Sequence, residues 1–178
     1  MVYLVSIIFS VVSLVLSQPQ IDEQIVKAVF LERITPFVIW PEECDMENST
    51  KDFIIGTWDD ESFYTKLKEV YFDKKILSKD VYIKNITRLK EIDDCNILYI
   101  PKIENSKLLR IIKYTHGSPI LLISDTPGYA KKGVHINLFI ENQNLGFEIN
   151  EEAVKDANIH ISHLLLELAK IVKSGSKY

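Results

Sequence analysis

The side chains that most often bind metals are few in this sequence and lie apart. The histidines are His116, His135, His160 and His163, and only the last two have a spacing that places them on one face of a helix. No HExxH sequence is present, and Glu167 is the acidic residue close to this pair. A zinc site needs several converging ligands, so we expect no metal and treat these histidines as surface residues.

The sequence also lacks the motifs of common enzymes. None of the six glycines falls into the GxGxxG or Walker spacing, and no GxSxG sequence is present. The paired carboxylates at 42–43, 59–60, 93–94 and 151–152 are neighbours in sequence. Such pairs are more typical of solvated loops and helix starts than of an acid–base pair. We therefore expect neither catalysis nor a cofactor.

The two cysteines, Cys44 and Cys95, leave two interpretations open. In an exported protein an even number of cysteines is compatible with a disulfide, and a bridge across this loop would stabilise the fold by about 4 kcal/mol. Two free, partly buried thiols are the alternative.

The most distinctive loop is SDTPGYA at residues 124–130. It follows a buried apolar run, and ligands of open α/β sheets dock at the carboxyl ends of the strands. The first interpretation is a structural turn, because a Pro-Gly pair suits a type II turn. The alternative is a binding site beside Gly56, made of Asp125, Thr126, Pro127, Gly128 and Tyr129.

An alternation of strands and helices would position this loop. Apolar runs with strand character occur at 52–58, 80–86, 95–100 and 119–124, and helical spacing occurs at 21–34, 62–71 and 105–114. Pro36 must end or kink the first helix, because its ring clashes with the carbonyl of Glu32. Strands joined by helices in this way favour right-handed crossovers and a mainly parallel sheet.

The pattern changes in the last third of the chain. Residues 134–140 and 145–149 are strand-like runs on either side of a polar turn, which predicts a hairpin. Asn150 is expected to cap a short helix, and Ser162 a last helix with an apolar stripe made of Leu164, Leu165, Leu168, Ile171 and Val172. The sequence thus predicts an α/β fold: a single three-layer domain with a mainly parallel sheet, an antiparallel edge hairpin and helices on both faces.

The net charge of the chain and its N-terminal residues indicate which partners and which location to expect. The 178-residue chain has a formal charge of -4 and no cluster of Lys or Arg, so we expect no nucleic-acid binding. Residues 1–17 are uncharged and largely apolar, but shorter than a comfortable membrane span of about 20 residues. We expect a signal peptide at 1–17 and a mature domain at 18–178, with no membrane insertion after cleavage. A retained anchor is the alternative.

Several segments together resemble the YfiR family. VKAVFLERITPFVIWP at 26–41 is similar to the opening helix and Trp-Pro turn of that family, and FIIGTWDDESFYTKL at 53–67 resembles its first strand, glycine and helix. CNILYI at 95–100, ILLISDTPGYAKKGVHINLFIENQNLGFEIN at 120–150 and ANIHISHLLLELAKIV at 157–172 resemble later segments in the same order. The resemblance therefore covers nearly all of the mature domain.

Two positions depart from the family pattern. Pro36 lies where the opening helix of the family usually continues. Some members pair the strand-start cysteine with a cysteine just before the first glycine, and Phe53 occupies that place here. By this comparison Cys95 either pairs with Cys44 or stays reduced.

The resemblance implies a bacterial periplasmic protein without known catalysis. Characterised members repress a membrane-bound diguanylate cyclase by holding its periplasmic sensory domain, which lowers cyclic-di-GMP. We therefore expect a regulator that binds the periplasmic domain of a membrane sensor and forms a homodimer. The candidate contacts outside the loop are Trp40 and Pro41, since aromatic anchors dominate many interfaces. A periplasmic small-ligand binding protein, with a cleft at the strand carboxyl ends, is the alternative function.

Overall fold

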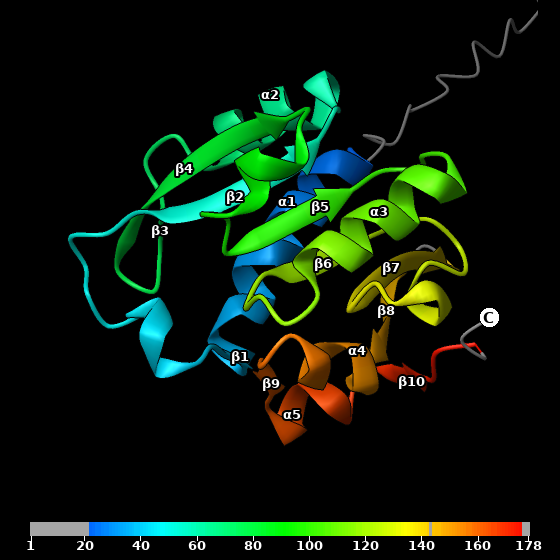
Figure 1. The fold of residues 1–178 in the computed structure, drawn as a ribbon. Coiled ribbons are helices and arrows are strands. Elements are labelled where there is room, and N and C mark those ends of the chain that lie inside the picture. The colour runs from blue at the N-terminus through cyan, green and yellow to red at the C-terminus, as the bar shows by residue number, and fades with distance from the viewer. Residues whose placement is uncertain (1–21, 143, 176–178) are drawn as a thin grey trace, which may run out of the picture.

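The computed structural model describes residues 22–142 and 144–175 (Figure 1). The segment expected to be a signal peptide, residues 1–17, lies outside the described residues, as does any boundary at residue 18. Among the described residues, no helix combines the length and the apolar character needed to cross a bilayer.

An eight-stranded sheet forms the centre of the molecule, in the order β10-β8-β7-β6-β5-β2-β4-β3. The neighbours from β4 to β7 are all parallel, while β7 and β8 form an antiparallel hairpin. Its strands are β2 (Phe53–Trp58), β3 (Lys75–Ile76), β4 (Lys79–Ile86), β5 (Ile97–Ile100), β6 (Leu121–Ser124), β7 (Ile136–Glu141), β8 (Asn144–Asn150) and β10 (Lys170–Val172). A separate antiparallel pair joins β1 (Val38–Ile39) to β9 (His160–Ile161).

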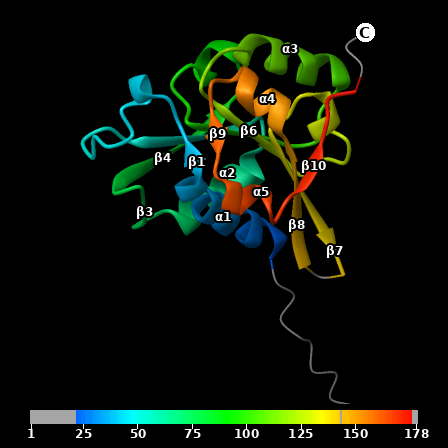
Figure 2. The same cartoon turned by 90° about the horizontal axis from the view of Figure 1, so that it is seen from below.

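Helices cover both faces of this sheet and bury two apolar cores. In Figure 1, α1 (Glu23–Ile34) and α2 (Glu61–Val70) lie behind the sheet and α3 (Asn105–Thr115) lies in front of it. Leu31 and Leu67 pack with one face of the strands, and Leu108 packs with the other. Figure 2 shows the shorter α4 (Glu151–Asp156) and α5 (His163–Leu166) beside β9 and β10. The predicted α/β fold with a mainly parallel sheet is confirmed.

The helix boundaries follow from identifiable residues. The carboxylate of Asp22 accepts a hydrogen bond from the Gln24 N–H at 2.9 Å and caps α1. The α-helix ends at Ile34, and Pro36 falls in a 3₁₀ turn, as its ring requires. Asn150 accepts from the Ala153 N–H at 3.1 Å and caps α4, which confirms the predicted cap.

The prediction of a long last helix is wrong. α5 contains four residues and is followed by β10, which pairs in parallel with β8, so that Lys170 lies opposite Glu148 and Val172 opposite Asn150. The outer edge of β8 offers backbone hydrogen bonds that a helix cannot use, and the β-branched residues Ile171 and Val172 suit a strand. The β7–β8 hairpin is therefore covered by one more strand and does not form the edge itself.

Candidate functional site

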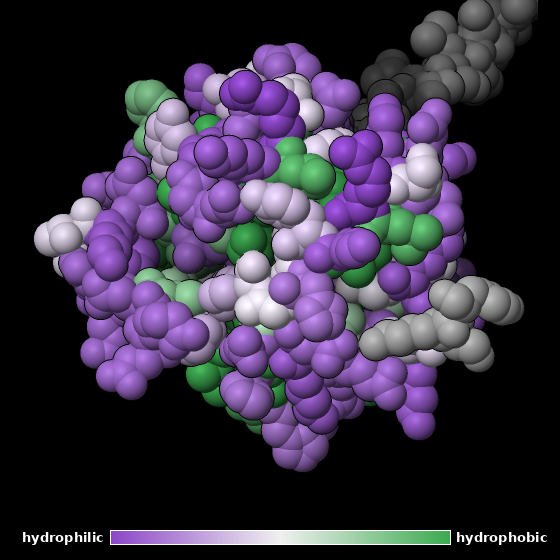
Figure 3. Space-filling view, viewed as in Figure 1, coloured by the Kyte–Doolittle hydropathy of each residue, from purple (hydrophilic) through white to green (hydrophobic). Residues whose placement is uncertain are grey.

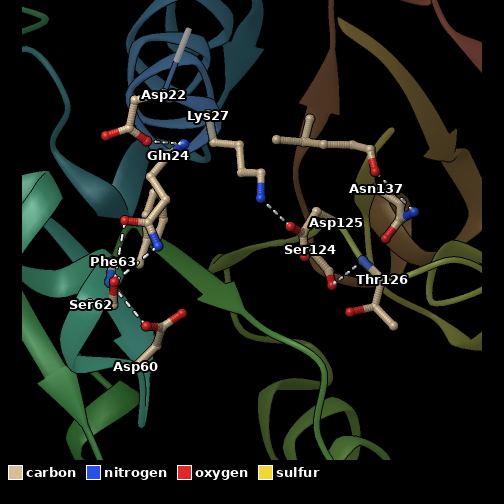
Figure 4. Close-up of polar contacts among 11 residues, drawn as sticks. Asp22, Gln24, Lys27, Asp60, Ser62, Phe63, Ser124, Asp125, Thr126 and Asn137 are labelled. Atoms are coloured by element: carbon tan, nitrogen blue, oxygen red, sulfur yellow. Dashed lines mark hydrogen bonds and ion pairs between the residues drawn. The ribbon is translucent and has the colours of Figure 1, made fainter. Parts of the chain in front are cut away.

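The loop after β6 is tied to α1 by an ion pair. The Lys27 ammonium on α1 donates to the Asp125 carboxylate, and both side chains are largely buried (Figure 4). The Tyr99 hydroxyl on β5 lies near the same carboxylate. Burial first, and then the charge of Asp125, raise the pKa of Tyr99 well above its usual value. Asp125 is therefore engaged within the protein.

The other residues of this loop are also held by internal contacts. The Thr126 N–H donates to the Ser124 hydroxyl at 3.1 Å, and Thr126 is buried. The hydroxyl of Tyr129 donates to the Ile103 carbonyl at 2.8 Å and accepts from the Ile103 N–H at 3.0 Å, which ties the loop to the segment after β5. Gly128 has a φ of 84°, which suits the second central position of the predicted turn.

Pro127 is the exposed member of the loop. The remaining members that the sequence singles out, Asp125, Thr126 and Tyr129, direct their polar atoms into the protein. The structure therefore gives the loop a structural role, and Pro127 and Gly128 are its outer surface.

Trp40 is a core residue below α1. It is buried, and its ring meets the Phe53 ring edge-on, with centroids 5.8 Å apart. Its indole nitrogen finds no acceptor among the described residues. Pro41 follows it at the half-exposed rim and leads into a 3₁₀ turn. The pair thus closes the first core and presents Pro41 outward.

Gly56 lies in the centre of β2 and is required by packing. A Cβ atom at this position would meet the Cys95 sulfur at 2.9 Å, Ile86 at 3.0 Å and Leu98 at 3.2 Å. The residue therefore contacts side chains of the α3 face of the sheet and does not line an open cleft.

Cys44 and Cys95 are both free thiols. Cys44 packs against the core under α1 and α2, whereas Cys95 belongs to the core under α3, so the sheet separates them. Burial raises the pKa of the Cys95 thiol to about 12, and burial also raises that of Cys44. The sequence left a disulfide and two free thiols as alternatives, and the structure agrees with two free thiols.

The histidines do not assemble with acids or cysteines. No group of three or more potential metal ligands occurs in the part of the chain that the structure describes. His135 is buried just before β7, where its Nδ1 accepts a hydrogen bond from the Leu122 N–H at 3.1 Å. Burial lowers the pKa of His135 to about 3, so the imidazole is neutral in the folded protein. The expectation that this histidine faces solvent is wrong.

A cationic cleft lies at the carboxyl ends of β2 and β4. It has a volume of about 480 Å³, with Trp58 and Asp59 at the end of β2, Arg88 after β4, and Lys107 and Arg110 on α3. The chain leaves β2 toward β4 on one side and β5 lies on the other, so the switch point, where open α/β sheets bind ligands, lies between β2 and β5 and borders this cleft at the end of β2. The cleft was not predicted from the sequence. Lys107 and Arg110 are three residues apart and so share one face of a predicted helix, which was a usable signal of a cationic surface.

An exposed apolar patch lies on α5 and the start of β10. Leu164 is 63% exposed, Leu168 is 77% exposed and Ile171 is 45% exposed. We call these three residues the α5–β10 patch. Figure 3 shows hydrophobic surface at the lower left edge of the molecule, where β1 and β9 lie in Figure 1. The sequence predicts that these three side chains belong to the apolar stripe of a last helix, so the exposed patch was not predicted.

The chain was compared with protein families, with curated proteins and with solved structures. The profile of a family described as YfiR/HmsC-like matches residues 24–170. No curated protein matches the chain. Among solved structures, a 3-hydroxyacyl-CoA dehydrogenase from Archaeoglobus fulgidus is similar, with 13% identity and a TM-score of 0.36. That alignment covers 76% of this chain and 52% of the dehydrogenase, so the chain spans about half the length of that protein.

Proposed function

The chain belongs to the YfiR/HmsC-like family, and on that premise we propose that it is an exported, non-enzymatic regulator that binds a membrane sensor protein. In this proposal the domain acts in the bacterial periplasm after residues 1–17 are removed. It holds the periplasmic domain of a sensor such as a diguanylate cyclase and represses its output, which lowers cyclic-di-GMP. The family match over residues 24–170 is the observation that carries the proposal.

The α5–β10 patch supports binding to another protein. Burying three large aliphatic side chains on a partner contributes about 1.5 kcal/mol or more for each, because apolar area leaves water. Polar and charged groups lie beside the patch: the His163 side chain lies 3.5 Å from the Glu167 carboxylate, and the Lys170 ammonium lies 3.5 Å from Glu148. An apolar centre with a polar rim is the usual anatomy of a protein interface. We therefore assign the sensor contact to this patch.

A binding experiment with membranes tests the proposal. The chain from residue 18, which contains every described element, is immobilised and exposed to detergent-solubilised membranes of the source bacterium. Mass spectrometry is expected to identify a membrane protein with a periplasmic domain and a cytoplasmic signalling domain. The purified periplasmic domain of that protein is then expected to bind in calorimetry. Recovery of no such protein, or no binding by its isolated periplasmic domain, contradicts the proposal.

The cationic cleft favours a second candidate function, the binding of a small anionic molecule. Lys107 and Arg110 supply positive charge beside an apolar wall formed by Trp58. Arg88 also lines the cleft but is paired with Glu91, and Asp59 is the acidic residue of the lining. Among the described residues, Lys107 and Arg110 form no ion pair. A ligand with one phosphate or carboxylate group and a compact apolar part fits this lining.

Tryptophan fluorescence tests this second function. The chain has two tryptophans, so a Trp40→Phe variant reports on Trp58 alone. Phenyl phosphate is the probe, and phenol and methyl phosphate are its controls. Saturable quenching by phenyl phosphate, weakened about tenfold in Arg110→Gln and unchanged in Lys113→Gln, supports a ligand site. Equal quenching by phenol, or in Arg110→Gln, argues against it.

A further inference from the structure

Exposed cations gather on the α3 side of the molecule. α3 lies in front of the sheet in Figure 1, and the side of the helix that faces the sheet buries Leu108 and Ile111. Lys107, Arg110 and Lys113 are spaced by three residues, so they follow one another along the outer surface of the helix. All three side chains are exposed. The helix therefore presents positive charge to solvent.

A turn from later in the chain adds charge to the same side. A Cβ atom at Gly133 would lie 3.2 Å from the Ile112 side chain, so the 3₁₀ turn Ala130–Lys132 packs beside α3. The Lys132 ammonium lies 5.4 Å from the centre of the Tyr129 ring, whose hydroxyl binds the backbone of the segment that leads into α3. The exposed cations of the turn and of this segment are Lys131, Lys132 and Lys102.

Six cations thus share one side of the molecule. We call them the α3 cationic face: Lys102, Lys107, Arg110, Lys113, Lys131 and Lys132. None of the six forms an ion pair among the described residues. No more than two of them are adjacent in the sequence, so the face arises from the fold and not from a basic run.

Few acids offset this charge. The acids of residues 101–133 are Glu104 and Asp125. Asp125 is paired with Lys27 of α1, on the opposite side of the sheet. Further acids border the face toward β4: Asp59, Asp93, Glu91 and Asp94. Ion pairs with neighbouring cations neutralise the last two. The face is therefore positive, although the whole chain has a formal charge of -4.

We propose that the α3 cationic face adsorbs to a membrane surface that contains anionic phospholipids. The headgroups form a wide and dense array of negative charges, and each Lys or Arg that comes close to such a surface adds to the attraction. Six cations on one side are within the range that is typical of peripheral, lipid-binding surfaces. The domain lies on the surface and does not insert.

The chemistry of the face favours lipid headgroups over an acidic protein. Five of its six cations are lysines, whose compact charges on flexible stems suit a mobile layer of phosphates. Arginine, with its rigid fork, predominates where a fixed carboxylate is recognised. Leu109 is 47% exposed beside these cations, and it enters the layer between the headgroups as an apolar side chain of an interfacial helix does. An acidic protein is the alternative that the experiment must exclude.

Adsorption to lipid is compatible with the proposed sensor contact. The α5–β10 patch shares no residue with the α3 cationic face, so a sensor and a lipid surface can be bound together. The periplasmic domain of a membrane sensor is tethered beside the lipid surface, and a regulator held on the same surface meets it at a higher effective concentration than one in solution. This consequence rests on the proposed function, whereas the lipid contact itself does not.

Vesicle flotation tests the lipid contact. The chain from residue 18 is mixed with vesicles of equal parts phosphatidylglycerol and phosphatidylcholine, or with vesicles of phosphatidylcholine alone. Binding to the first kind is expected to be at least tenfold tighter and to weaken when salt screens the charges. Poly-L-glutamate, at the same concentration of anionic groups, stands for an acidic protein and is expected to leave the chain on the vesicles. Equal binding to the two kinds of vesicle, no binding to the first, or displacement by poly-L-glutamate overturns the proposal.

Two matched triple variants locate the contact. The first removes three charges of the face that lie outside the cationic cleft: Lys113→Gln, Lys131→Gln and Lys132→Gln. It is expected to bind the phosphatidylglycerol vesicles at least tenfold more weakly. The control removes three exposed cations elsewhere and so has the same net charge: Lys51→Gln, Lys74→Gln and Lys75→Gln. It is expected to bind like the unaltered chain. Equal losses in the two variants overturn the assignment to the α3 side, and neither measurement depends on a sensor.

Discussion

The ammonium of Lys27 on α1 and the carboxylate of Asp125 after β6 form an ion pair that fastens the first helix to the carboxyl end of the sheet. The two residues are far apart in the sequence, and the Asp125 carboxylate also lies beside the Tyr99 hydroxyl. The loop sequence thus serves the packing of α1.

Removal of the Lys27 ammonium is expected to destabilise the fold. In Lys27→Met the Asp125 carboxylate stays largely buried without its partner, which costs about 2 kcal/mol of unfolding free energy. Urea unfolding measures the loss. The control is Lys155→Met, which breaks an exposed pair of 3.6 Å with Glu151 and is expected to cost less than about 0.5 kcal/mol. Equal losses in the two variants are incompatible with a buried, fastening role for Lys27.

A side chain at position 56 is expected to be poorly tolerated. In Gly56→Ala the added methyl group meets the Cys95 sulfur, so we expect a loss of about 2 kcal/mol in unfolding free energy. The second substitution Cys95→Ala removes that sulfur and is expected to recover part of the loss, because the two positions are coupled. Additive effects of the two changes in urea unfolding would show that they do not touch.

The two thiols are expected to differ in reactivity. Burial of Cys95 and its pKa of about 12 keep it a protonated, inaccessible thiol, whereas Cys44 is partly exposed. Ellman's reagent is expected to modify about one thiol per folded chain and the second only after unfolding. Mass spectrometry before and after reduction is the control. A mass gain of two hydrogens on reduction would demonstrate a bridge and contradict the free thiols.

Acid is expected to weaken the fold through His135. The unfolded chain binds a proton at this residue below its ordinary pKa of 6.5, whereas the native imidazole does so only near 3. The stabilisation is therefore complete above pH 6.5 and falls at lower pH, by about 1.4 kcal/mol per pH unit from this residue. His135→Asn keeps an acceptor for the Leu122 N–H and removes the titration. Its unfolding free energy should depend less on pH between 6 and 4 than that of His160→Asn, and identical slopes would refute the assignment.

Local sequence signals were sufficient to predict the strands at the centre of the fold. The runs that became β2, β5 and β6 are apolar on both faces, as strands covered by helices on both sides must be. The β7–β8 hairpin and the cap at Asn150 also follow from short-range chemistry. The strands β1, β3 and β9 contain two residues each, which is too few to produce a periodic pattern.

The surfaces could not be predicted, because they depend on contacts that are distant in sequence. Leu164 and Leu168 have helical spacing, and only the free edge of β8 explains why the chain continues as β10. Arg88 and Arg110 line the same cleft, but this can be predicted only when the strand order is known. For the same reason, the α3 cationic face becomes visible only when the turn Ala130–Lys132 is seen to pack beside α3.

Binding of a membrane sensor through the α5–β10 patch is the central proposal. Leu168→Asp places a charge on the most exposed residue of the patch, and Leu109→Asp makes the same change on α3, where Leu109 is 47% exposed. Binding of both variants to the periplasmic domain of the recovered sensor is measured by calorimetry. We expect Leu168→Asp to weaken binding at least tenfold and Leu109→Asp to bind like the unaltered chain. Equal affinity of Leu168→Asp and the unaltered chain, or no measurable binding by the unaltered chain, would contradict it.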